Sequence, residues 1–156
     1  AFETWSAVLK PVRHFGEANL LDPASPGAIY DCQSEAAPDS PLVLITTAGW
    51  NPCDNLMERL RDFGNGVVAV RLAMTGADGL HTQQTFFFPG GVKIDPMTFT
   101  FWRNFAATKE FAYGPGIHKS LLMRQRAGEL ADRTSFTRFL PVRGEGTWHG
   151  RDPLKW

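Results

Sequence analysis

The stretch Leu42-Val43-Leu44-Ile45-Thr46-Thr47 decides the fold of this chain. Its β-branched, apolar composition is typical of a strand that is buried on both faces. Asn51 and Pro52 follow, and a capping residue before proline is typical of the first turn of a helix. Four apolar residues at helical spacing then give that helix one apolar stripe: Leu56, Met57, Leu60 and Phe63. The stretch therefore predicts a buried strand followed by an amphipathic helix.

The residues after this helix predict two more extended segments. Gly64 and Gly66 are expected to end the helix. Residues 67–74 are expected to form a second strand, followed by a turn at residues 75–79. Residues 81–88 have an extended pattern that ends at Pro89-Gly90-Gly91.

The downstream half of the chain completes a recognisable order of elements. Residues 97–102 alternate in character, with Met97, Phe99 and Phe101 on one face and Thr98, Thr100 and Trp102 on the other. Residues 106–113 and 117–130 have helical composition and are separated by Gly114-Pro115-Gly116, and residues 135–142 have the pattern of a last strand. With the extended residues 81–88 and 97–102 taken as two pieces of one strand, the order is strand, helix, strand, strand, helix, strand. This is the split βαβ order, so the sequence predicts an α+β, ferredoxin-like fold.

The first 41 residues differ from the rest in composition. Seven prolines and glycines interrupt them, which permits short strands and turns, with residues 28–30 as one short candidate strand. We expect residues 1–41 to be an N-terminal extension packed on the core and residues 42–156 to be the ferredoxin-like domain.

The predicted sheet has apolar residues on both faces. Helices cover one face of such a sheet, and an apolar second face needs a cover of its own. A homodimer that packs sheet on sheet, as an α/β barrel, would supply that cover and enclose a cavity. Aromatic residues make up 12% of the chain, which is enough to line a large apolar cavity or to form an ordinary core.

Composition and missing motifs narrow the classes of function. Sixteen basic residues balance sixteen acidic ones, so the chain lacks the positive surplus of a general nucleic-acid binder. No apolar run approaches a membrane span, and no signal-peptide pattern is present, so a cytoplasmic protein is expected. The two cysteines, Cys32 and Cys53, encode neither a disulfide framework nor a cysteine-rich metal site. Phosphate-binding loops and zinc-protease motifs are absent from the sequence.

Four histidines are the candidate chemical groups. His14 and His149 lie in polar, loop-like segments, and His81 opens an extended segment after a turn, so all three are expected at or near the surface. His118 lies in the first turn of a predicted helix, close to Leu121 and Leu122. A neutral imidazole in this setting can ligate haem iron, or it can simply hydrogen-bond to a neighbour.

Two segments resemble a known family. The run Phe136-Thr-Arg-Phe139, with the tail from Gly146 through Trp148 to Leu154, is similar to the C-terminal end of spheroidene monooxygenase-like proteins. Residues 101–113 together with His118 and Arg124 also resemble this group and the wider dimeric α/β-barrel superfamily of antibiotic biosynthesis monooxygenase-like proteins.

The resemblance implies a ferredoxin-like protomer that dimerises through its sheet and inserts oxygen into a hydrophobic or aromatic small molecule. It also implies haem b, with the iron held by a histidine of the C-terminal helix, and only His118 fills that position here. His118 is thus the expected catalytic and metal-ligating residue. We expect the haem pocket to be walled by Phe99, Phe101 and Trp102, with Arg103 or Arg124 pairing with a propionate.

Two alternatives stay open at this point. A cofactor-independent oxygenase or isomerase of the same fold would use His81 or His118 as a base. A non-enzymatic dimeric module would bind a hydrophobic ligand or a partner without chemistry.

Overall fold

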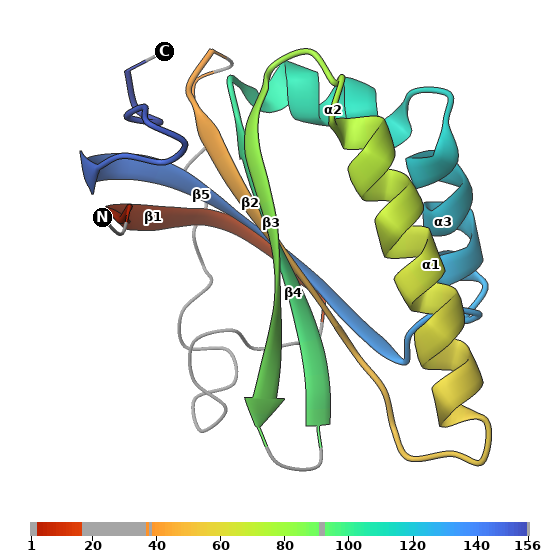
Figure 1. The fold of residues 1–156 in the computed structure, drawn as a ribbon. Helices are drawn as coiled ribbons and strands as arrows, with labels where there is room; N and C mark the ends of the chain where they lie inside the picture. The colour runs from red at the N-terminus through yellow and green to blue at the C-terminus, as the bar shows by residue number, and fades with distance from the viewer. Residues whose placement is uncertain (1–2, 17–36, 38, 91–92, 156) are drawn as a thin grey trace.

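A computed structural model describes residues 3–16, 37, 39–90 and 93–155 of the chain (Figure 1). Its elements are β1 (Trp5–Gly16), β2 (Leu42–Gly49), α1 (Leu56–Met74), β3 (Leu80–Gly90), β4 (Lys93–Trp102), α2 (Phe105–Tyr113), α3 (Ile117–Arg126) and β5 (Arg133–Gly146).

The strands form one antiparallel sheet in the order β1-β5-β2-β4-β3, and the helices pack on one side of it (Figure 1). The last four strands of this order have the arrangement of a ferredoxin-like sheet, in which β2 lies between β5 and β4. The predicted α+β, ferredoxin-like architecture is therefore confirmed.

The second predicted strand, at residues 67–74, is wrong. These residues are the second half of α1, which continues to Met74, and the strand position next to β4 belongs to β3 instead. Gly64 and Gly66 do not end the helix. Gly66 is buried where α1 meets α3, and a Cβ there would lie 3.1 Å from both methyl carbons of Leu121. The α3 helix in turn ends at Arg126, short of the expected residue 130.

Two apolar clusters fill the space between the sheet and the helices. One lies near the end of β2, where Ala48, Trp50 and Ala131 meet three apolar residues of α1: Leu56, Leu60 and Phe63. The other lies at the opposite end of α1 and joins Met74, Trp102 and Ala107, with Phe111 packed against it. Burying these residues supplies the main stabilisation of the helical layer.

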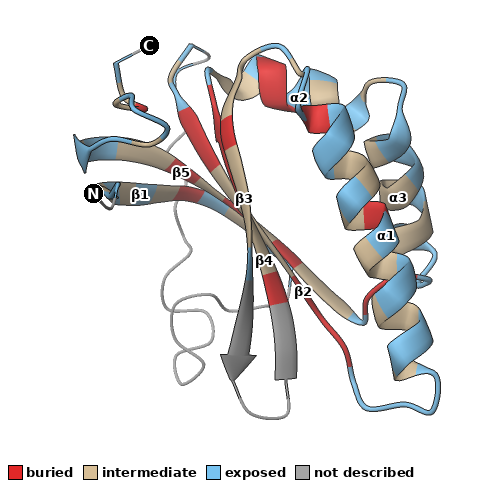
Figure 2. Cartoon of the chain, in the orientation of Figure 1, coloured by how far each residue is buried: buried red, intermediate tan, exposed pale blue. Residues whose placement is uncertain are grey.

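A third cluster lies on the sheet face that the helices leave open. Val43, Phe99, Phe101 and Phe139 are all buried there, and each has at most 8% of its surface exposed. Figure 2 shows buried positions along the central strands of the sheet. Three groups from the chain's own ends pack against them: Trp5 of β1, and Trp148 and Leu154 of the C-terminal tail. The tail therefore supplies part of the cover for this face within one chain.

The N-terminal extension contributes an edge strand. β1 pairs with β5 along its whole length, with register shifts between Val8 and Leu9 and between Pro11 and Arg13. The candidate strand at residues 28–30 lies outside the described residues. No helix in the described part of the chain has the length and apolar character needed to cross a membrane.

Candidate functional site

His118 lies at the start of α3, just after the break that separates it from α2. Its Nδ1–H donates a hydrogen bond to the carbonyl oxygen of Ala112, at 3.1 Å, and its ring lies 5.4 Å from the ring of Phe111. The Gly114-Pro115-Gly116 break lets α3 fold back so that its first turn meets the last turn of α2. Two groups of α2 thus orient the imidazole: the backbone carbonyl of Ala112 and the ring of Phe111.

Burial keeps this imidazole neutral. It lowers the pKa of His118, and the weaker effect of the Ala112 hydrogen bond acts in the opposite direction. With Nδ1 donating, Nε2 carries the lone pair, and it has no hydrogen-bond partner among the described residues. A neutral imidazole held in one tautomer by a carbonyl is the arrangement found in metal-ligating histidines, and it also suits a base.

The aromatic residues expected to line one pocket lie on opposite faces of the sheet. Trp102 faces the helices, and its ring lies 5.5 Å from Phe111, which in turn contacts His118. Phe99 and Phe101 belong to the cluster on the other face. Within one chain, β4 therefore brings only Trp102 toward His118.

The two arginines expected to pair with a propionate already have carboxylate partners. Arg103 forms an ion pair with Asp78 at 2.6 Å, and both side chains are largely exposed. Arg124 binds Asp62 of α1 at 2.6 Å and Glu129 at 2.8 Å, which raises the pKa of the guanidinium. In this structure Arg124 holds α3 against α1.

These positions divide the expected haem site into a part that fits and a part that does not. The imidazole of His118 has a fixed tautomer, the ring of Phe111 beside it, and an Nε2 without a hydrogen-bond partner in the described part of the chain, which suits a histidine that would hold haem iron. The expected walls Phe99 and Phe101 and the expected propionate partners do not gather around it. Among the described residues, no group of three or more histidine, cysteine, aspartate or glutamate side chains is placed to hold a metal ion.

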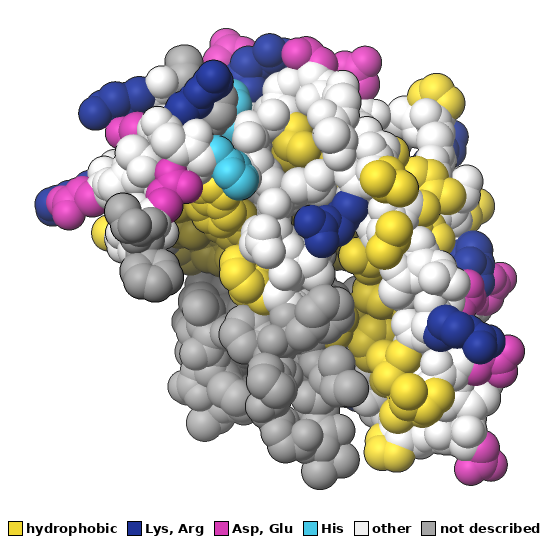
Figure 3. Space-filling model, viewed as in Figure 1, with side chains coloured by type: hydrophobic (Ala, Val, Ile, Leu, Met, Phe, Trp, Pro, Cys, Tyr) yellow, Lys and Arg dark blue, Asp and Glu magenta, His cyan; other side chains and the backbone are white. Residues whose placement is uncertain are grey.

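A separate pocket of about 370 Å³ opens where β3 meets the C-terminal tail. Figure 3 shows histidine side chains beside basic and acidic ones at this end of the molecule. The pocket combines two imidazoles, a guanidinium and an indole, and its lining is His81, Thr82, Trp148, His149, Arg151 and Pro153.

His81 is the chemically distinctive group of this pocket. Its ring lies 5.4 Å from Phe101, and partial burial lowers its pKa, with the charge of Arg103 adding to the effect. A neutral imidazole beside an aromatic wall can accept a proton from an acidic substrate. The expectation that His81 is near the surface is compatible with its intermediate exposure.

The other side of the pocket depends on a tight turn in the tail. Trp148 and Arg151 bridge each other, and the residues between them, His149 and Gly150, have φ values of 55° and 72°. Both central residues of a type I′ turn need positive φ, which Gly adopts at no cost. The N–H of Gly150 donates to Glu3, and this hydrogen bond is the main reason why the pKa of Glu3 is lowered. The sequence signal for this turn is the His-Gly pair.

Trp148 packs the turn against the sheet. Its indole stacks on Phe99 with ring centres 5.5 Å apart and planes 12° apart, and it also meets the edge of Trp5 at 5.9 Å. Phe99, which was expected to wall a haem pocket, stacks instead on Trp148 from the chain's own tail.

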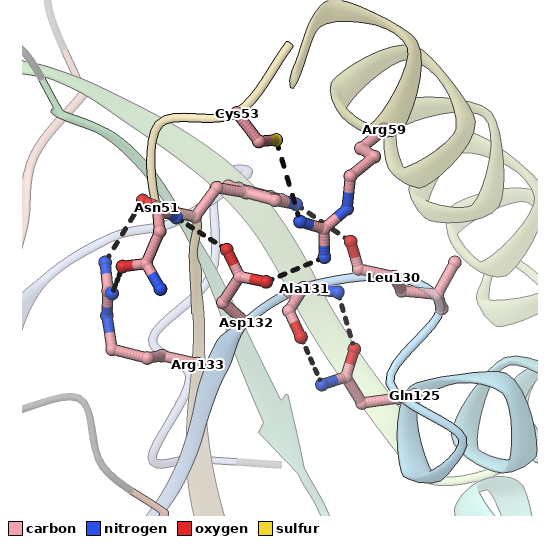
Figure 4. A network of polar contacts seen from close by, with 9 residues as sticks. Asn51, Cys53, Arg59, Gln125, Leu130, Ala131, Asp132 and Arg133 are labelled. Atoms are coloured by element: carbon pink, nitrogen blue, oxygen red, sulfur yellow. Dashed lines mark hydrogen bonds and ion pairs between the residues drawn. The ribbon is translucent and has the colours of Figure 1, made fainter. Parts of the chain in front are cut away.

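A polar network at the far end of the sheet is structural in character (Figure 4). Asp132 accepts hydrogen bonds from Arg59 and from the backbone N–H of Asn51, and these lower the pKa of Asp132. Arg133 donates to Asn51 and to the carbonyl of Trp50. The network ties the end of β2 and the start of α1 to the start of β5.

Comparison with known proteins bears on the whole chain. No protein-family model matches it. It is 25% identical over 158 aligned residues to spheroidene monooxygenase of Rhodobacter capsulatus; the match covers 99% of this chain and 59% of that protein's length. The solved structure of Rv0793 from Mycobacterium tuberculosis is similar with a TM-score of 0.53 and 20% identity, over 67% of this chain and 97% of that one. The chain is thus related to spheroidene monooxygenase, with an α+β, ferredoxin-like fold.

Proposed function

We propose that this chain is a monooxygenase-type oxidoreductase that acts on an apolar or aromatic small molecule with a haem held by His118. The observation that carries the proposal is the oriented imidazole, whose Nδ1–H donates to Ala112 while Nε2 is left with its lone pair. The name of the related protein supports oxygen insertion as the type of reaction. Because the chain spans 59% of that relative's length, the activity is proposed for this chain and not transferred to it.

The residues around His118 have defined tasks in this proposal. The carbonyl of Ala112 fixes the tautomer and direction of the imidazole. This hydrogen bond would also make Nε2 more basic, and so a better ligand for iron than an imidazole without it. Phe111 lies against the imidazole and Trp102 packs against Phe111, so the two rings would shield that side of His118 from water. Bound haem would supply the activation of oxygen, and the protein would supply binding, orientation and an apolar surrounding.

The test is haem uptake by the full-length chain. The purified chain would be titrated with haemin, and the intensity and position of the Soret band would be recorded. We expect stoichiometric uptake by the unchanged chain and loss or displacement of the Soret band in His118→Ala. His149→Ala is the matched control, because it removes an exposed imidazole far from α3 and should bind haem as the unchanged chain does.

Two results would contradict the proposal. A chain that takes up no haemin cannot use the group, and equal spectra for the unchanged chain and His118→Ala would assign the iron to another ligand. Circular dichroism of each variant separates lost folding from lost binding.

The pocket beside His81 favours a second candidate function, a cofactor-independent oxygenase or isomerase. There, His81 would act as the base on a substrate that lies against Trp148 and itself activates oxygen. Oxygen consumption with quinol substrates, in the absence of haem, tests this function. His81→Ala should abolish such activity, whereas His118→Ala should leave it intact. If the chain neither takes up haem nor consumes oxygen with these substrates, the third hypothesis, a non-enzymatic ligand-binding module, becomes the one to test.

A further inference from the structure

Two arginines lie directly opposite each other on neighbouring strands. Arg13 of β1 and Arg138 of β5 are register partners in the antiparallel pair. Both guanidinium groups lie over the ring of Phe15, Arg13 at 4.8 Å and Arg138 at 5.5 Å from its centre. Like charges placed directly opposite each other on a sheet repel, so this pair costs stability unless something compensates the charge.

The second arginine is also partly removed from water. Arg138 lies between two aromatic rings, because its guanidinium is also 4.4 Å from the centre of the ring of Phe105, the first residue of α2. Burial lowers the pKa of Arg138; Tyr113 acts in the opposite direction, and the charge of Arg13 adds to the lowering. Arginine keeps its proton under these conditions, so the site holds a desolvated cation next to another cation.

No carboxylate of the described residues compensates these charges. Neither Arg13 nor Arg138 makes a hydrogen bond or ion pair within the described part of the chain. The other half-buried arginines that the structure describes all donate to an oxygen: Arg59, Arg124 and Arg133. Arg138 is therefore the exception among arginines of similar burial.

We propose that Arg13 and Arg138 form a binding site for a carboxylate carried on an apolar molecule. A carboxylate between the two guanidinium groups would relieve their repulsion and accept their N–H groups in a fork geometry. The exposed ring of Phe15 and the neighbouring Phe105 would contact the apolar body of the ligand. This site lies between β1, β5 and the start of α2, and it does not depend on haem at His118.

The experiment uses the full-length chain with octanoate as the probe. Isothermal titration calorimetry would compare octanoate with its neutral analogue octanamide, at matched ionic strength. We expect saturable binding of octanoate and much weaker binding of octanamide. Removing one guanidinium in Arg13→Gln or Arg138→Gln should weaken octanoate binding about tenfold or more.

A matched control lies on the same strand. Arg143→Gln removes an exposed arginine of β5 that already pairs with Glu145, and octanoate should bind this variant as tightly as the unchanged chain. Arg13 is exposed, so Arg13→Gln tests the site even if Arg138→Gln fails to fold.

Three outcomes would overturn the proposal. Equal affinity for octanoate and octanamide would remove the role of charge. Unchanged affinity in Arg13→Gln would assign the carboxylate to another site. Acetate or inorganic phosphate binding as tightly as octanoate would show a surface that attracts any anion and has no place for an apolar body.

Discussion

His118 shows how much of a side chain's chemistry comes from its neighbours. The sequence places it in the first turn of a helix, but it does not show that Ala112 accepts its Nδ1–H or that Phe111 lies beside it. Those contacts depend on the angle between α2 and α3, which the glycine–proline break permits without specifying. The candidate residue could be found from the sequence, and its tautomer and environment could not.

The lowered pKa of His118 predicts how stability changes with acidity. Burial favours the neutral form in the folded chain, while the unfolded chain binds a proton near pH 6.5. The unfolded state therefore takes up more protons as the pH falls below about 6.5, and the free energy of unfolding decreases. His118→Gln should show a shallower decrease between pH 7 and pH 5, measured by urea unfolding at several pH values.

Ser120→Ala is the control for this measurement. It changes the same turn of α3 without removing a titratable group, so its acid dependence should follow that of the unchanged chain. A His118→Gln variant with the same acid dependence as the unchanged chain would show that the imidazole is not buried as the structure has it. His81, whose pKa is also lowered by burial, accounts for part of the dependence that stays in His118→Gln.

At the scale of one element, α1 shows why the sequence prediction was wrong in one place. Two glycines followed by Val67, Val68 and Val70 are typical of a helix end and a new strand. The helix continues through them because its second half buries apolar residues such as Val70 and Met74 against Trp102 of the sheet. Tertiary packing overrides the local preference of these residues, and a single sequence does not show that packing.

Alanine substitutions at the two glycines of α1, Gly64 and Gly66, should change the stability of the chain differently. At Gly64 no heavy atom lies within 4 Å of an added Cβ, so Gly64→Ala should stabilise the chain by about 0.5–1 kcal/mol through helix propensity. At Gly66 the Cβ would press on Leu121 at 3.1 Å, so Gly66→Ala should gain less than Gly64→Ala or destabilise the chain. Urea unfolding of the two variants measures the difference.

A result in the reverse order would contradict the packing of α1 on α3. If Gly66→Ala were the more stabilising of the two, Leu121 would not lie against the helix at that turn. If both substitutions proved neutral, neither helix propensity at Gly64 nor the contact of Gly66 with Leu121 would act as the structure has it.

At the scale of the molecule, strand order was predictable and the site was not. The order of elements from Leu42 onward leads to a ferredoxin-like sheet, even though one strand was assigned to the wrong residues. The alternation of β4 already places Phe99 and Phe101 on the face opposite Trp102, so the sequence held a signal against a pocket walled by all three. The sequence held no signal for the tail as the partner of Phe99, because the two are far apart in the chain.

The tail also changes the argument for a homodimer. The apolar face of the sheet is the reason for expecting a second subunit, but Trp148 and Leu154 pack against the cluster around Phe101 within one chain. The homodimer stays a prediction, and it no longer rests on this part of the face. What the tail contributes can be measured separately from what a partner contributes.

Trp148→Ala separates the two contributions. It removes an indole that stacks on Phe99 and meets Trp5, so the free energy of unfolding should fall by about 2 kcal/mol, less than for a fully buried tryptophan. Val142→Ala, an exposed change on β5, should stay within about 0.5 kcal/mol of the unchanged chain. The uncovered Phe99 should also bind a fluorescent apolar dye that the unchanged chain does not bind. Light scattering of the same samples shows whether they are monomers or dimers. If Trp148→Ala is a dimer that keeps its stability and binds no dye, a partner subunit and not the tail protects this face.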